Sequence, residues 1–321
     1  MPTSDLFDRI RAAAAEVARR ARFVHLDRER LAAYAAELPP PATAPGLDPR
    51  WHWLGRGEET VAFFLTLDAV NFGSGWFPVL RKRPGLSGYF TVAASLADAY
   101  RARGGPLAAR ELADIDAPAV AEIFGQDPDG PAAELMALFA RAWNDLGRLL
   151  RDAHGGRFGA LVEAADGCAA RLVDLLARMP FYRDVSAYGD LEVPFYKRAQ
   201  LTAADLAAAF GRRGPGRFLD LDRLTIFADN LVPHVLRLDG VLVYDQRLAA
   251  RIDAQELIAA GSPEEVEIRG VAVHAVERLV DTLRANGVNT SARELDYLLW
   301  NRGLVDKYKA IPRHRTRTVY Y

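Results

Sequence analysis

Two short segments place a charged residue among aromatic and apolar neighbours. In the first, Lys197 follows two aromatic residues, and in the second, Asp229 follows Phe227 and Ala228. A carboxylate or an ammonium in such surroundings has a perturbed pKa, which is typical of catalytic groups. Asp229 is therefore a candidate catalytic acid or base.

The spacing around Asp229 leaves two interpretations open. Apolar residues recur at helical steps over 220–238, which predicts a helix, but Pro233 lies inside the pattern and lacks a backbone donor. The helix should therefore kink or break near Asp229. A carboxylate beside a broken helix suits chemistry, whereas Asp is also a preferred N-cap for the helical half that follows.

Lys197 and Arg198 lie in a passage from an extended segment to a helix. Pro194 precedes them, and Thr202 would cap a helix beginning at Ala203. Basic residues in such a passage suit a phosphate or a carboxylate, and an ordinary surface pair is the alternative. Burial separates the two, because a buried lysine needs a counter-ion or loses its proton.

Aromatic residues are concentrated between positions 51 and 90. Phe72 and Trp76 flank a loop with two glycines, and Asn71 precedes it. Such a loop allows close approach of a flat ligand and stacking on an aromatic face, although most aromatic residues at this density pack in a core.

The tail after Pro312 combines His314, Arg315 and two further arginines with a Tyr-Tyr ending. This pattern fits either a phosphate contact or a disordered basic end. Farther upstream, Glu267 follows the helix start at 262–265, where an acidic residue also simply favours the helix N-terminus.

Composition excludes several classes of function. The 41 Lys and Arg residues against 42 Asp and Glu give a net charge of -1, which disfavours binding to long nucleic acids. The only cysteine is Cys168, and the six histidines show no metal-binding spacing. We expect no metal, no cofactor, no signal peptide, no membrane span and a cytoplasmic location.

The elements that must position these residues are mostly helical. Helices are expected at about 4–20, 58–70, 88–103, 116–124, 131–150, 158–178, 203–211, 220–238, 246–260, 262–286 and 291–300, and one short strand at 240–244. The chain is therefore expected to be mainly α with little β. Without a long linker or an internal repeat, we expect a single elaborated helical domain over 1–321.

The sequence resembles the queuosine salvage proteins, which are queuosine 5'-phosphate N-glycosylases. The resemblance runs from about residue 50 to the end and would leave 1–50 as an N-terminal helical extension packed on the domain. It rests on these segments: Asn71-Phe72, Tyr182-Arg183-Asp184-Val185, 195–200, Phe227-Ala228-Asp229 with Pro233, 265–270, Leu295-Asp296-Tyr297, Leu299-Trp300, His314-Arg315 and Tyr320-Tyr321. The chain departs from the family at 73–76 and around Asn230, so the resemblance assigns no stacking residue there.

The resemblance implies a fold similar to helix-hairpin-helix DNA glycosylases and release of queuine and ribose 5-phosphate from queuosine 5'-monophosphate. It implies Asp229 as the catalytic carboxylate, with Lys197 holding it ionised and oriented. The expected substrate-binding residues are Asn71, Phe72, Trp76, Tyr196, Arg198, Phe227, His234, Glu267, Arg269, Asp296, His314 and Arg315.

The implied partner is a small nucleotide, with no nucleic-acid polymer, membrane or obligate protein partner. A non-catalytic binder of a modified deazapurine nucleoside or nucleotide and a DNA glycosylase are the alternatives. Only the enzymatic interpretations need Asp229.

Overall fold

Helices dominate this computed structural model, which describes residues 6–39 and 46–321. Their bounds are α1 Leu6–Arg20, α2 Arg28–Glu37, α3 Glu58–Ala69, α4 Gly88–Arg103, α5 Ala109–Asp114, α6 Ala117–Ile123, α7 Ala133–Ala153, α8 Phe158–Glu163, α9 Ala169–Leu176, α10 Lys197–Ala209, α11 Leu231–Leu238, α12 Gln246–Asp253, α13 Pro263–Ala285, α14 Ala292–Gly303 and α15 Asp306–Lys309. None of the helices in the described ranges is long and apolar enough to cross a membrane.

Two small antiparallel sheets supply the strands of the described residues. β1 (Val24–Leu26) pairs with β4 (Leu242–Tyr244), and β2 (Val185–Tyr188) pairs with β3 (Leu191–Pro194). The predicted mainly α class with little β is confirmed, and β4 is the strand expected at 240–244. Similarity to helix-hairpin-helix glycosylases stays a prediction.

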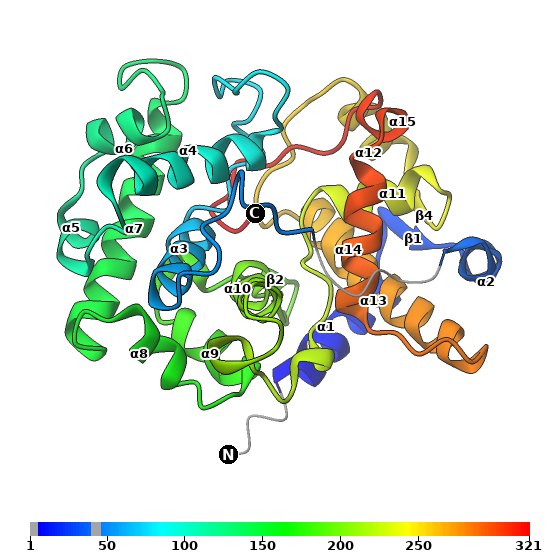
Figure 1. Ribbon diagram of the computed structural model, residues 1–321. Helices are drawn as coiled ribbons and strands as arrows, with labels where there is room; N and C mark the ends of the chain where they lie inside the picture. Colours follow the sequence, from blue (N-terminus) through cyan, green and yellow to red (C-terminus); the bar gives the residue numbers. More distant parts are fainter. Residues whose placement is uncertain (1–5, 40–45) are drawn as a thin grey trace.

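Figure 1 shows the helices in two groups, with α10 between them and the C-terminus ending among them. One group contains α3 to α9, and the other contains α1, α2 and α11 to α15. Within the second group α1 packs on α13, where a Cβ atom on Gly270 would lie 2.9 Å from Val17. Residues 1–5 and 40–45 of the expected N-terminal extension lie outside the described part.

The longer helices follow the apolar period of the sequence. In α7 the buried side chains Leu135, Phe139, Trp143, Leu146 and Leu150 recur at three- and four-residue steps. The indole of Trp143 donates to the carbonyl of Thr66 in α3, 2.9 Å away. The predicted helices at 58–70, 88–103 and 116–124 are present as α3, α4 and α6.

The single helix predicted at 158–178 is wrong, because α8 and α9 are separate. Asp166 and Gly167 between them have φ values of 51° and 66°, a left-handed conformation that cannot continue an α-helix. The carboxylate of Asp220 accepts hydrogen bonds from the amides of Ala169 (2.6 Å) and Ala170 (3.0 Å) at the start of α9. A distant side chain therefore fixes this helix start.

The helix predicted at 220–238 is also mostly wrong. Only a 3₁₀ turn at Leu221–Arg223 and the later helix α11 form, so residues 224–230 are not helical. Pro233 lies in the first turn of α11, where its missing N–H needs no intrahelical partner. The predicted helix at 246–260 ends early, at Asp253.

Candidate active site

A cavity of about 250 Å³ opens where α10, α14, the start of α11 and the C-terminal segment meet. Its lining includes these residues expected from the sequence: Asn71, Phe72, Lys197, Phe227, Asp229 and Asp296. It also includes residues that sequence reasoning did not select: His52, Ser74, Phe77, Tyr89, Phe90, Leu201, Asp205, Asn230, Tyr297, Trp300, Asn301, Arg313 and Tyr321.

Asp229 both caps a helix and faces the cavity. Its Oδ1 accepts hydrogen bonds from the amides of Leu231 (2.7 Å) and Val232 (3.2 Å) at the start of α11. Its Oδ2 accepts no hydrogen bond from the part of the chain that the structure describes. The cap orients the carboxylate and leaves one oxygen available to a ligand.

Lys197 is the first residue of α10, so the helix predicted to begin at Ala203 starts earlier. Thr202 is not its cap, because the Thr202 hydroxyl donates to the Arg198 carbonyl within the helix, at 2.9 Å. Tyr196 adopts the left-handed conformation (φ 48°), and the Asp184 carboxylate accepts the Lys197 amide at 3.0 Å. Backbone strain at Tyr196 and a carboxylate from another segment therefore set the position of Lys197.

The Lys197 ammonium has neither a hydrogen bond nor an ion pair among residues 6–39 and 46–321. Burial lowers its pKa, and the negative charge of Asp229 opposes that change. Both groups therefore line the cavity without a hydrogen bond or ion pair between them, and the charge of Asp229 favours the cationic form of Lys197.

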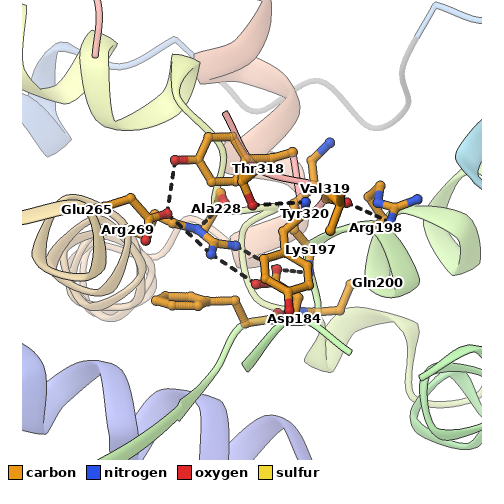
Figure 2. A network of polar contacts seen from close by, with 12 residues as sticks. Asp184, Lys197, Arg198, Gln200, Ala228, Glu265, Arg269, Thr318, Val319 and Tyr320 are labelled. Atoms are coloured by element: carbon orange, nitrogen blue, oxygen red, sulfur yellow. Dashed lines mark hydrogen bonds and ion pairs between the residues drawn. The ribbon is translucent and has the colours of Figure 1, made fainter. Parts of the chain in front are cut away.

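A buried ion pair behind the cavity connects these two groups (Figure 2). The Arg269 guanidinium donates to both Asp184 oxygens, at 3.0 and 2.6 Å, and its Nε donates to the Ala228 carbonyl at 2.9 Å. The same Asp184 carboxylate holds the Lys197 amide. One pair therefore fixes both the start of α10 and the residue before Asp229. We call Asp184, Arg269 and Glu265 the brace.

The brace is enclosed on all sides. The guanidinium carbon of Arg269 lies 3.9 Å from the ring centroid of Phe195 and 4.8 Å from that of Tyr321. The Tyr321 hydroxyl donates to Glu265 at 2.9 Å. Burial works against the charge of Arg269, but Asp184 and Glu265 outweigh burial and raise its pKa. Arg269 lies outside the cavity lining and has a structural role in the brace, and its expected substrate contact stays a prediction.

Arg198 is likewise structural. Its guanidinium donates to the carbonyls of Asp68 (3.0 Å), Ala69 (2.7 Å) and Val319 (2.8 Å), and also to that of Phe181. Burial lowers its pKa. With its donors committed to carbonyls, Arg198 joins α3 to the C-terminal segment and lies outside the cavity lining.

Glu267 faces away from the cavity. Its Oε2 accepts the amides of Arg22 (3.0 Å), Phe23 (2.6 Å) and Val24 (3.0 Å), and its Oε1 accepts the Tyr188 hydroxyl at 2.6 Å. Its carboxylate is therefore occupied in fixing the turn between α1 and β1. The expected contact of Glu267 with the base is corrected accordingly.

Other expected substrate contacts also lie outside the lining. The Trp76 indole donates to Glu134 at 2.7 Å, and Nε2 of His234 lies 2.9 Å from the Tyr308 carbonyl. Tyr196 is the residue that precedes α10. These side chains support the residues that line the cavity.

Arg313 is a cationic tail residue in the cavity lining, whereas His314 and Arg315 lie outside the lining. Burial lowers the pKa of His314 to about 3, so its imidazole is neutral and offers no charge to a phosphate. The Arg313 guanidinium has no hydrogen bond or ion pair in the described ranges. Burial lowers its pKa, and the charge of Asp229 opposes that change. The basic tail in the sequence indicated this region, but it did not distinguish Arg313 from the adjacent His314 and Arg315.

Asp296 lies beside Asp229 in the cavity wall. Its Oδ1 accepts the Phe227 amide at 2.9 Å. Burial, and then the negative charge of Asp229, raise the pKa of Asp296 well above its usual range. Burial and the charge of Asp229 therefore favour the protonated form of Asp296, which can donate a proton.

Aromatic side chains form the cavity walls. The rings of Tyr89 and Phe90 lie 6.1 Å from that of Trp300, and the ring of Phe227 lies 6.1 Å from that of Tyr297. Such walls accommodate a flat ligand. The sequence pointed to this aromatic region, and the structure divides it between the cavity and the core, where Phe63 and Phe64 are fully buried.

Comparison with known proteins gives one consistent result. A family model described as "Queuosine salvage protein" matches residues 51–321. A protein of Sphaerobacter thermophilus named queuosine 5'-phosphate N-glycosylase/hydrolase is 39% identical over 284 residues, which cover 87% of each chain. The protein of the same name from Mus musculus is 31% identical and covers 97% of this chain and 98% of its own. That from Dictyostelium discoideum is 32% identical over 82% of this chain and 79% of its own.

Proposed function

The chain belongs to the queuosine salvage protein family, and we propose that it hydrolyses the N-glycosidic bond of queuosine 5'-phosphate. The products are the base queuine and ribose 5-phosphate. The observation that carries the proposal is the Asp229 carboxylate, oriented by two backbone amides, with its second oxygen available in an aromatic-walled cavity.

Asp229 suits the charge that develops at the ribose. Glycoside hydrolysis passes through an oxocarbenium-like transition state, and a fixed negative charge near C1' stabilises it. The available Oδ2 also suits a water molecule that attacks C1'. The positive charge of Lys197 lies near this carboxylate and interacts with it electrostatically.

Departure of the base requires its own help. When the bond between C1' and the base nitrogen breaks, the electron pair goes to the base, which must gain a proton as water adds hydroxide to C1'. A 7-deazaguanine has no N7 that could be protonated beforehand. We assign this proton to Asp296, because burial and the charge of Asp229 raise the pKa of its carboxyl and favour the protonated form. The proton that the attacking water releases goes to the Asp229 carboxylate.

Arg313 suits the 5'-phosphate. It is a cationic side chain in the lining with no ion pair among the described residues, and a guanidinium binds phosphate through two parallel donors. We further propose that the enzyme acts in the cytoplasm on the mononucleotide, without an obligate protein partner. The net charge of -1 supports a small substrate over a nucleic-acid polymer.

Incubation of the purified protein with queuosine 5'-phosphate tests the proposal. Chromatography should detect free queuine and ribose 5-phosphate in equal amounts. Tight binding of the nucleotide without release of the base would contradict the hydrolase and leave a non-catalytic binder.

A further inference from the structure

A second polar group lies on the same face of α10 as Lys197. Lys197, Leu201 and Asp205 all line the cavity at four-residue steps. Two helical turns separate the first from the last, or about 12 Å along the helix axis. The cavity therefore has a carboxyl group displaced along α10 from the Lys197 end.

Asp205 lies close enough to Asp68 from α3 for the charge of Asp68 to help raise the pKa of Asp205. Their exposed fractions are only 5% and 0%, respectively. No N–H group in the described ranges donates to the Asp205 carboxyl. Thr202 lies near Asp68, but its hydroxyl already donates to the Arg198 carbonyl at 2.9 Å.

Two buried carboxyls close to each other disfavour a second negative charge. Burial raises the pKa of Asp68 to about 7, and burial together with the charge of Asp68 raises that of Asp205 well above its usual range. Asp205 is only 5% exposed, and its carboxyl accepts no hydrogen bond from the described residues, so it offers a buried acceptor to the cavity.

This acceptor lies in a cavity with aromatic walls. Tyr89 and Trp300 belong to the same lining, with their rings 6.1 Å apart at 85°. A flat base held between aromatic surfaces presents its edge to the polar groups of the cavity, and a buried acceptor binds only an edge that carries N–H donors.

We propose that Asp205 is the base-specificity site and accepts hydrogen bonds from the ring N–H and exocyclic amino group of a guanine-type base. This inference rests on the proposed function and adds the residue that selects the base. Asp68, close to Asp205, is a positioning residue, which acts on the base only through Asp205. A hypoxanthine-type base lacks the exocyclic amino group and therefore cannot form the hydrogen bond that this group donates to Asp205.

Calorimetric binding of two free bases, 7-deazaguanine and 7-deazahypoxanthine, tests the inference. The wild type should bind 7-deazaguanine about 10- to 100-fold more tightly, the usual effect of a lost buried hydrogen bond. Asp205→Leu should reduce this ratio to near one, and Asp205→Ala provides the same test if the leucine does not fold. Asp229→Asn, at the Lys197 end, should keep the ratio.

Asp68 has its own pair of variants. Asp68→Leu should narrow the ratio, and Asp68→Asn should restore it, because its amide can donate to Asp205. A merely structural role for Asp68 would not move the ratio between two bases.

An unchanged ratio in the Asp205 variants would overturn the inference while base release by the wild type left the proposed function standing. A wild type that bound neither base and released none from queuosine 5'-phosphate would overturn the proposed function and this inference with it.

Discussion

Two sets of acidic and basic side chains lie close together in this protein and differ in how their hydrogen-bonding capacity is used. In the brace, the Asp184 carboxylate accepts three N–H groups, and Arg269 donates to Asp184 and to the Ala228 carbonyl. In the cavity, Asp229 keeps one oxygen available, and Lys197 and Arg313 make no ion pair among the described residues. The same residue types therefore stabilise the fold when all their hydrogen-bonding groups are occupied. They suit catalysis when some of these groups remain available to a ligand.

The comparison also shows how the two sets depend on each other. The brace fixes the Lys197 amide and the carbonyl before Asp229, so the available groups are held by the occupied ones. Substitutions in the cavity should therefore change activity with little change in stability, and substitutions in the brace should change stability first.

The largest effect is expected for Asp229→Asn. Without the negative charge, kcat should fall about 10³-fold or more, the range found for electrostatic and acid–base groups. Asn is also a good N-cap, so the melting temperature should stay nearly unchanged. Steady-state kinetics and thermal unfolding check both, with the exposed Asp190→Asn as control. An Asp229→Asn variant with near-normal kcat would contradict the catalytic role of the available cavity groups.

Next comes Asp184→Asn in the brace. It leaves Arg269 buried with only Glu265, 3.6 Å away, as a counter-charge. Breaking a buried pair from one side costs about 3–5 kcal/mol of unfolding free energy. Urea unfolding measures this loss, and Asp281→Asn, in an exposed pair with Arg278, should cost under about 1 kcal/mol. Equal losses in the two variants would contradict the brace.

Lys197→Met should lower kcat about 100-fold, because Asp229 loses a nearby cation. Since this buried ammonium has no direct partner in the described ranges, its removal should leave the unfolding free energy unchanged or higher. Kinetics and urea unfolding test both statements, with exposed Lys309→Met as the matched control. A strongly destabilised Lys197→Met would place Lys197 with the brace.

Sequence patterns predicted much of the fold. Apolar periods and end signals located α3, α4, α7 and α13, and the capping box of Ser291 with Glu294 is present at α14. They failed where a distant group sets a helix start, as the carboxylate of Asp184 does for α10 and that of Asp220 for α9. Local spacing contains no information about such contacts.

The site was predictable only in part, because local spacing again contains no information about distant contacts. Asp229 and Lys197 stand out among apolar neighbours, and the structure places both at the cavity. Arg269 and Arg313 look alike as single basic residues, and only the partner of Arg269, 85 positions away, reveals that it is structural. Asp205 lies two helical turns after Lys197 on the same face of α10. This relation could not be predicted, because the helix was expected to begin only at Ala203.

Arg313→Gln should raise the KM for the 5'-phosphate about 10-fold, with kcat less affected, because a phosphate contact contributes to ground-state and transition-state binding alike. The variant should treat nucleoside and nucleotide more equally than the wild type does. The neighbouring Arg317→Gln, which loses a pair with Glu134 and the contact of the guanidinium with the Trp76 ring, should keep the preference. A nucleotide preference that survived in Arg313→Gln would remove Arg313 from phosphate binding.

The smallest effect concerns His314, which packs against Tyr321 at the brace. Its pKa is about 3 when folded, below the ordinary 6.5 expected when unfolded. Between these values only the unfolded chain binds the proton, so stability falls as pH decreases from 6.5, by up to about 1.4 kcal/mol per pH unit.

His314→Asn should therefore lose less stability than the wild type between pH 7 and about 5.5, as measured by urea unfolding. The exposed His25→Asn is the control and should follow the wild type. Identical acid sensitivity in His314→Asn would show that His314 contributes nothing to it.

The central claim is that Asp229 and Lys197 act on the ribose while the brace holds them in place. A crystal structure of Asp229→Asn with intact queuosine 5'-phosphate tests it most directly. We predict that C1' of the ribose lies between residue 229 and Lys197, with the phosphate at Arg313. A substrate bound with C1' away from residue 229 would contradict the account.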